Sequence, residues 1–125
     1  MTRTWDIFCS VVDNFGDIGV CWRLARQLAS EPGQSVSLWV NDLASFHRLC
    51  HSVDPARPSQ RIGAVEVRHW EAAFQRVESA DIVVEGFGAR LPDAYIEAMA
   101  ARLPHPVWIN LEYLSAENWV EACHG

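Results

Sequence analysis

Residues 7–19 decide the fold, and they read Ile7-Phe8-Cys9-Ser10-Val11-Val12-Asp13-Asn14-Phe15-Gly16-Asp17-Ile18-Gly19. An apolar run of the strand type leads into a turn and then into the start of a helix, where many α/β proteins carry a glycine-rich phosphate loop. Here the glycines give only a GxxG spacing, and Asp13 and Asp17 stand where a phosphate would bind. A pyrophosphate would be repelled by both carboxylates, so this loop excludes a dinucleotide site and favours a cation.

The rest of the chain repeats this alternation of strand-like and helix-like segments, which predicts an α/β fold. The sequence predicts a Rossmann-like, mainly parallel sheet with helices on both faces, formed by one domain over residues 1–125. We expect strands at residues 6–12, 35–40, 65–70, 80–85 and 106–111, with 65–70 near the edge of the sheet. We expect helices at 17–30, from a cap at Asn41 or Asp42 to near Val53, at 71–77, at 92–103 and from Ser115 onward, and a loop or insertion at 54–63.

The charge composition excludes several functions. The formal net charge is −6, and all ten basic residues are arginine. Without lysine there is no phosphate-loop lysine, no Schiff base and no switch lysine of a receiver domain, which argues against a receiver-like Mg²⁺ site at Asp13 and Asp17. The acidic balance argues against nucleic acid as a partner. No apolar run is long enough to span a membrane and the first residues do not resemble a signal peptide, so we expect a cytoplasmic protein without a membrane partner.

Cysteine, histidine and tryptophan residues have simple structural interpretations. Cys9 and Cys21 lie on an apolar strand and an apolar helix face, which is typical of buried thiols. The trio of His47, Cys50 and His51 has helical spacing but no fourth ligand, so a solvent-facing helix surface is favoured over a metal site. The six tryptophans fall mostly at core positions, although Trp22 flanks the acidic loop together with Phe15 and offers an alternative pocket lining.

Polar residues gather where the predicted strands end. Parallel sheets bind ligands outside the carboxyl ends of their strands, at the switch in strand order. The residues placed there are Asp13, Asn14, Asp17, Glu85, Gly86, Phe87, Gly88, Asn110 and Glu112. A helix N-cap explains either aspartate alone, but it does not explain two aspartates with two glycines. A guanidinium suits such an acidic site, because it is planar, always charged and bound bidentately by carboxylates.

Five blocks of sequence resemble one known family in the same order. They are WDIFCSVVDNFGDIGVCWRLARQL (5–28), LWVNDL (38–43), VRHW (67–70), LPDAYIEAMAAR (91–102) and NLEYLSAENWVEACHG (110–125). They are similar to the bacterial elongation factor P arginine rhamnosyltransferases, apart from Phe15 in place of tyrosine and Cys21 in place of threonine. The resemblance implies the N-terminal, acceptor-binding half of a GT-B glycosyltransferase whose C-terminal nucleotide-sugar domain is absent here.

The resemblance also implies a reaction. An inverting, metal-independent enzyme without a cofactor transfers rhamnose from dTDP-β-L-rhamnose to one arginine of elongation factor P. By the family match Asp13 and Asp17 are the catalytic carboxylates, with Asp17 the favoured base. Residues Asn14, Phe15, Gly16, Gly19, Asn110 and Glu112 are the expected substrate-binding positions. We expect this chain alone to be inactive, and the alternative function is a non-catalytic module that docks a basic loop of a partner protein.

Overall fold

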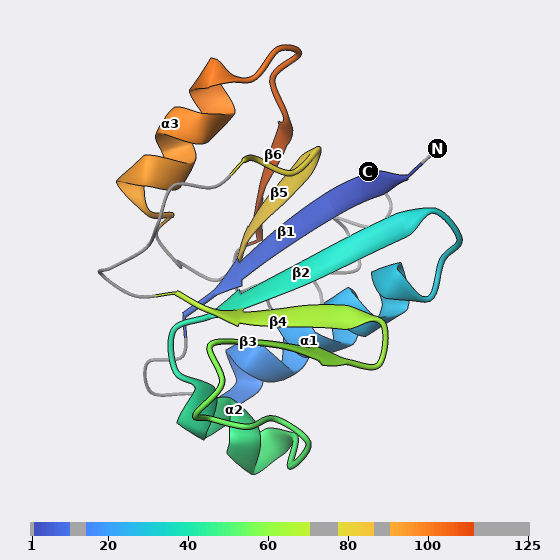
Figure 1. Cartoon of the computed structure of the whole chain (residues 1–125), viewed down its shortest axis with the longest axis vertical. Helices are drawn as coiled ribbons and strands as arrows, with labels where there is room; N and C mark the ends of the chain where they lie inside the picture. The colour runs from blue at the N-terminus through green and yellow to red at the C-terminus, as the bar shows by residue number, and fades with distance from the viewer. Residues whose placement is uncertain (1, 11–14, 71–77, 87–90, 112–125) are drawn as a thin grey trace, which may run out of the picture.

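The computed structural model contains a single twisted sheet with helices on both faces (Figure 1). It describes residues 2–10, 15–70, 78–86 and 91–111, and for residues 15–17 it describes the backbone only. The elements in chain order are β1 (Arg3–Cys9), α1 (Phe15–Ala29), β2 (Gln34–Val40), α2 (Leu43–Leu49), β3 (Ser59–Ile62), β4 (Val65–His69), β5 (Ile82–Gly86), α3 (Asp93–Ala101) and β6 (Val107–Leu111). None of the helices in this part of the chain is both long and apolar enough to cross a membrane.

The six strands lie in the order β3-β4-β2-β1-β5-β6. All neighbouring pairs are parallel except β3 with β4, so the sheet is mixed rather than purely parallel. The predicted α/β class, the helices on both faces and the five parallel strands are confirmed. Strand β1 lies between β2 and β5, and the order of strands along the chain reverses between β1 and β5.

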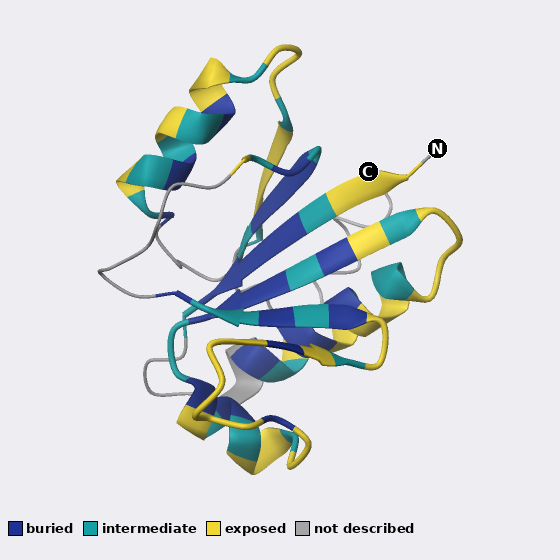
Figure 2. Cartoon of the chain, viewed as in Figure 1, coloured by how far each residue is buried: buried dark blue, intermediate teal, exposed yellow. Residues whose placement is uncertain are grey.

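One face of the sheet is covered by α1 and α2. The helical spacing predicted in residues 17–30 is confirmed, because Ile18, Cys21 and Ala25 are fully buried in one apolar cluster. They pack against alternate strand residues, among them Ile7 and Leu38. Phe46 of α2 joins the same cluster and meets the ring of Trp22 edge-on, with centroids 5.3 Å apart. Trp22 is thus a core residue. The buried positions form a continuous band along the central strands (Figure 2).

The opposite face is covered by α3. Its residues Tyr95 and Met99 are buried against Phe8, Trp39 and Val83, which form a second, aromatic cluster. Because successive side chains of a strand point to opposite faces, Phe8 faces α3 while its neighbours Ile7 and Cys9 face α1. The ring of Phe8 stacks on Trp39 with centroids 5.6 Å apart and meets Tyr95 edge-on at 4.7 Å.

Several predicted element boundaries were wrong by two or three residues. The first strand was predicted at 6–12 but β1 spans Arg3–Cys9, because its exposed polar start is held by backbone pairing with β2 rather than by apolar side chains. Helix α3 ends at Ala101 rather than at residue 103, and Pro92 is its N-cap. The helices predicted at 71–77 and from Ser115 lie outside the described residues.

The segment predicted as a loop at 54–63 contains strand β3. It forms a hairpin with β4 through Gly63 and Ala64, and Gly63 has a φ of 61°, which suits glycine. The polar sequence of β3 gave no strand signal, because its pairing with β4 is made by the backbone.

The start of α2 was predicted correctly, but its end was not. Asp42 is the N-cap, and its carboxylate accepts from the backbone N–H of Ser45 at 3.1 Å and from the Ser45 hydroxyl at 2.8 Å. These bonds lower the pKa of Asp42, with the Ser45 hydroxyl as the largest cause. The helix ends at Leu49 rather than near Val53, because the chain turns back so that His47 Nδ1 donates to the Val53 carbonyl at 2.7 Å.

Candidate functional site

The candidate site is the edge of the sheet at which the parallel strands end. Register places His69, Val40, Cys9, Gly86 and Leu111 side by side in one row across β4, β2, β1, β5 and β6. The switch in strand order falls between Cys9 and Gly86 in this row. In open α/β sheets ligands bind at such a switch point, so we expect the site beside Cys9 and Gly86.

Only part of the predicted site lies among the described residues. Asp13, Asn14 and Glu112 lie outside them, and of Phe15, Gly16 and Asp17 only the backbone is described. Asp17 is the third residue of α1, so the interpretation of Asp17 as a helix N-cap is wrong. Its backbone lies in the first turn, where the helix dipole stabilises a negative charge.

Two glycines at this edge have different surroundings. A Cβ atom on Gly86 would lie 2.9 Å from the Cys21 sulfur and 3.1 Å from the Phe8 carbonyl oxygen, so only glycine fits between β5 and α1 without a shift. A Cβ on Gly19 would meet its nearest described neighbour, Leu49 Cδ2, at 3.8 Å, which is an ordinary contact. The close approach at Gly86 therefore fixes α1 against the end of β5, beside the switch point.

Two further predicted positions are brought together by β5 and β6. Glu85 and Asn110 are direct partners in the register, and Glu85 is also a partner of Phe8. Their side chains therefore belong to the face of the sheet that α3 covers. Glu85 is half-buried and Asn110 is exposed, so this pair contributes a carboxylate and an amide to the edge of the site.

A polar cluster at the same edge was missed by the sequence analysis. The Asn41 side-chain amide donates to the Ser10 hydroxyl at 3.2 Å, and His69 Nε2 donates to the backbone carbonyl of Asn41 at 3.0 Å. These contacts join the ends of β1, β2 and β4. The predicted strand at 6–12 placed Ser10 inside the strand. Its polar side chain in an otherwise apolar run was the available signal that the strand ends there.

The trio of His47, Cys50 and His51 does not form a metal site in the described structure. The two imidazole rings are 5.6 Å apart, but Nδ1 of His47 is bonded to the Val53 carbonyl. Across the described residues, no group of three or more His, Cys, Asp or Glu side chains has an arrangement that would hold a metal ion.

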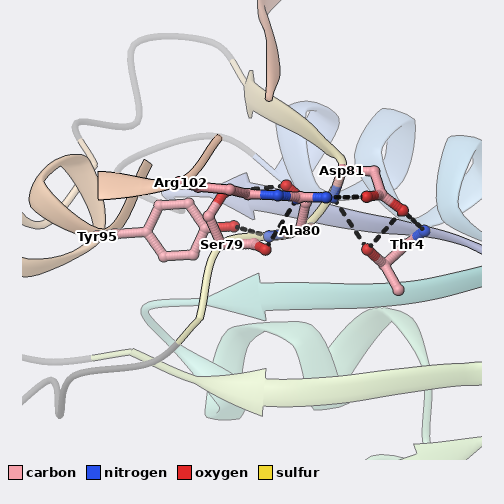
Figure 3. A network of polar contacts seen from close by, with 6 residues as sticks. All are labelled: Thr4, Ser79, Ala80, Asp81, Tyr95 and Arg102. Carbon is pink, nitrogen blue, oxygen red and sulfur yellow. Dashed lines mark hydrogen bonds and ion pairs between the residues drawn. The ribbon is translucent and has the colours of Figure 1, made fainter. Parts of the chain in front are cut away.

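The opposite end of the sheet contains a polar hollow with a volume of about 570 Å³. In Figure 3, the Asp81 carboxylate faces Thr4 and Arg102. It accepts from the Thr4 backbone N–H at 2.8 Å and from the Thr4 hydroxyl at 3.1 Å, and it forms an ion pair with Arg102. Arg102 also donates to the Ser79 carbonyl at 3.1 Å.

These contacts lower the pKa of Asp81 to about 2, with the Thr4 backbone N–H as the largest cause and Arg102 next. Thr4, Asp81, Arg102 and the Ser79 carbonyl are bonded to one another, and they join the end of α3 to the starts of β1 and β5. We therefore interpret this end of the sheet as structural, and the carboxyl edge remains the candidate site.

Comparison with known proteins gives consistent matches over almost the whole chain. A family model described as "Elongation-Factor P (EF-P) rhamnosyltransferase EarP" matches residues 5–125. A protein-arginine rhamnosyltransferase of Pseudomonas putida is 58% identical over 125 residues, which is 100% of this chain and 33% of that protein. The protein of the same name from Pseudomonas aeruginosa is 54% identical over 121 residues, and that from Shewanella oneidensis is 44% identical over 127 residues, each match covering 97% of this chain and 32% of the relative. The chain thus spans about a third of the length of these curated relatives, at 33% of the first.

Proposed function

Because this chain belongs to the family of elongation factor P rhamnosyltransferases, we propose that it supplies the acceptor-binding part of an enzyme that transfers rhamnose to an arginine side chain of elongation factor P. The single observation that supports this most strongly is the family match over residues 5–125, which includes the whole acidic loop. Relatives at 58% and 54% identity are named protein-arginine rhamnosyltransferases, and we extend the reaction in that name to this chain.

The charge of the acidic loop is consistent with this substrate. The guanidinium of arginine is protonated at neutral pH, so it is bound well by carboxylates but is a poor nucleophile. In our proposal Asp13 and Asp17 bind the guanidinium and turn one nitrogen toward the sugar. The position of the Asp17 backbone in the first turn of α1 supports this proposal, because a carboxylate there is stabilised in its charged form.

The proposed step is an inverting displacement. An arginine side-chain nitrogen attacks C1 of the rhamnose, and the bond from C1 to the diphosphate oxygen breaks with its electron pair leaving on dTDP. The guanidinium loses one proton, and we propose Asp17 as its acceptor. The helix dipole stabilises ionised Asp17, which favours binding of the cation but makes a weak base, so orientation and charge stabilisation contribute more than proton removal.

The remaining parts of the proposal concern the longer enzyme. We propose a GT-B architecture in which this chain forms the N-terminal half and a second domain binds dTDP-β-L-rhamnose, with neither a metal ion nor a cofactor in the reaction. We also propose that the enzyme acts in the cytoplasm. An active site between two domains implies that the 125-residue chain alone transfers no sugar.

Substitution of Asp17 tests the proposed role. In the full-length enzyme, Asp17→Asn keeps the size of the side chain but removes its charge and its basicity. We expect rhamnose transfer to elongation factor P to fall by about 10²–10⁴, the usual contribution of a general base. The matched control is Glu31→Gln, because Glu31 is exposed and lies between α1 and β2, at the opposite end of the sheet. Transfer by Asp17→Asn within about tenfold of the control would show that the assigned role is wrong.

A binding measurement separates this function from that of a non-catalytic docking module. Full-length protein is titrated with elongation factor P, and then with elongation factor P in which the acceptor arginine is changed to methionine. We expect weaker binding after this single change, together with transfer to the unchanged factor. Tight binding of both factors without any transfer would support the docking module instead.

A further inference from the structure

The backbone pairing of β1 with β2 stops just before the acidic loop that contains Asp13. The last register pair of the two strands is Cys9 with Val40, and the next residues along each chain segment are Ser10 and Asn41. The Asn41 side-chain amide donates to the Ser10 hydroxyl at 3.2 Å, and both residues are half-buried. This side-chain contact therefore continues the pairing of the strands by one residue, up to the point where the acidic loop begins.

The position of Asn41 is set in turn by β4. His69 is the last residue of that strand, and its Nε2 donates to the backbone carbonyl of Asn41 at 3.0 Å. The backbone N–H of the next residue, Trp70, donates to the Val40 carbonyl at 3.1 Å. Figure 1 shows the ends of β1, β2 and β4 at the same edge of the sheet. Two bonds from β4 thus hold the end of β2, from which the Asn41 amide reaches Ser10.

The two predicted catalytic carboxylates belong to different elements. Asp17 is in the first turn of α1, and close packing at Gly86 fixes that helix against the sheet. Asp13 is the third residue after Ser10, so the covalent chain keeps their Cα atoms within about 11 Å of each other. Since Asp13 follows the end of β1 whereas Asp17 belongs to the helix, the position of Ser10 affects how far apart the two carboxylates lie.

We propose that Asn41 and His69 are positioning residues, which hold the end of β1 so that both carboxylates of the acidic loop bind one guanidinium. This inference rests on the proposed function, because it concerns the same site. Two carboxylates repel each other, so the protein must hold them together at a single cation. Their arrangement orients the attacking nitrogen, and a displacement of about 1 Å can lower a rate by about 100-fold. Asn41 and His69 act through the strand end and need no contact with the substrate.

Kinetics of the full-length enzyme test this proposal. Asn41→Ala removes the donor to Ser10 but keeps the backbone carbonyl that His69 binds. We expect kcat for rhamnose transfer to elongation factor P to fall by about 10- to 100-fold, with KM for this acceptor within about threefold of the parent value. Orientation of one nitrogen acts in the transition state, whereas a protein acceptor is bound over a larger surface. Ser10→Ala should have the same effect, and the double variant should be no slower, because both substitutions remove one contact.

The matched control is Gln34→Ala, which removes a contact between the same two strands near their opposite end. There Trp5 Nε1 donates to the Gln34 side-chain carbonyl at 2.6 Å, and both residues are half-buried. We expect the control to keep kcat within about twofold of the parent, because this bond is far from the acidic loop. A second comparison uses His69→Gln, whose amide replaces Nε2 as a donor, and His69→Leu, which has no donor. The glutamine variant should retain more of the parent kcat than the leucine variant.

The outcomes separate this inference from the proposed function. Transfer by the parent enzyme together with an unchanged kcat in Asn41→Ala would overturn the inference alone. A rise in KM without a loss of kcat, or an equal loss in Gln34→Ala, would also overturn it. No transfer by the parent would overturn the proposed function and this inference with it. If urea unfolding shows that Asn41→Ala is unfolded under the assay conditions, Ser10→Ala, which removes a single oxygen atom, decides between the same outcomes.

Discussion

The two faces of the sheet are held by different kinds of contact. On the α1 and α2 face the buried cluster is apolar, and it packs so tightly at Gly86 that a single methyl group does not fit. On the α3 face the aromatic cluster encloses a carboxylate, because Asp6 is 8% exposed and accepts from the Tyr95 hydroxyl at 2.6 Å. Packing of the helices on the first face therefore depends on the fit of apolar side chains. Packing of α3 on the second face depends on such a fit together with hydrogen bonds.

The difference shows what fixes the position of each helix. The hydrophobic effect has no preferred direction, so close packing alone fixes an apolar helix face on an apolar sheet. The folded protein loses stability when a buried polar group lacks its hydrogen-bond partner. Such a pair therefore fixes the position of the helix that carries the partner. Tyr95 has this role for α3, because its hydroxyl donates to Asp6 and accepts from the Ala80 N–H at 3.0 Å.

The largest effect is expected on the shape-dependent face, from Gly86→Ala. The added methyl group would overlap the Cys21 sulfur and approach the Phe8 carbonyl oxygen, and a backbone atom cannot rotate away. Overpacking of this kind typically costs about 1–3 kcal/mol, and we expect a value near the upper limit. Urea unfolding measures it. The double variant Gly86→Ala, Cys21→Ala should recover part of the loss, and a loss unchanged by the second substitution would exclude overlap with the sulfur.

A smaller effect is expected on the other face, from Tyr95→Phe. The ring remains in the aromatic cluster, but Asp6 loses a donor and the Ala80 N–H loses its acceptor. An unsatisfied buried group costs about 1–3 kcal/mol, and we expect a value in the lower half because the ring keeps its packing contacts. Urea unfolding at pH 7 measures it.

The pH dependence of the same variant identifies Asp6 as the group affected. Burial raises the pKa of Asp6 above its ordinary value of 3.8, and the Tyr95 hydrogen bond opposes this shift. A carboxyl whose pKa is raised on folding binds more protons in the folded state, so its contribution to stability falls as the pH rises above 3.8. Tyr95→Phe should therefore destabilise the protein less at pH 3.5 than at pH 7. An equal loss at both values would contradict the assignment to Asp6.

The sequence predicted the apolar face better than the polar one, for a physical reason. Helical spacing of apolar residues is a local pattern, and it correctly placed Cys21 and Ala25 in the core. Asp6 and Tyr95 are 89 residues apart, and no local sequence pattern around either of them predicts their hydrogen bond. Strand β3 was missed for the same reason, since its signal is its backbone pairing with β4.

The candidate site also contains residues that a local sequence pattern reveals and residues that it does not. The helix that follows the acidic loop was predicted from a local pattern of apolar residues, and α1 confirms it, although the helix begins at Phe15 rather than at residue 17. The contacts of Asn41 with Ser10 and His69 join three strand ends that are far apart in the sequence, so they become visible only in the folded sheet. The catalytic role of Asp13 and Asp17 stays a prediction, because their side chains lie outside the described part of the chain.

The smallest effect is expected from Arg102→Gln, which removes the ion pair at the opposite end of the sheet. The side chains of Arg102 and Asp81 are 30% and 35% exposed, and solvent screening limits such pairs to below about 1 kcal/mol. Urea unfolding in low and high salt measures the effect, and the difference between variant and parent should shrink as salt is added.

Asp81 gives the stability of the parent protein a pH dependence opposite to the one that comes from Asp6. Its pKa is lowered from 3.8 to about 2, so its contribution to stability is present above 3.8 and is lost as the pH falls toward 2. The Thr4 backbone N–H is the largest cause of this shift, and Arg102→Gln leaves that bond in place. The variant should therefore reduce the acid dependence only in part. If the substitution abolished the dependence, the ion pair rather than the Thr4 bond would be the main contact that holds Asp81 ionised.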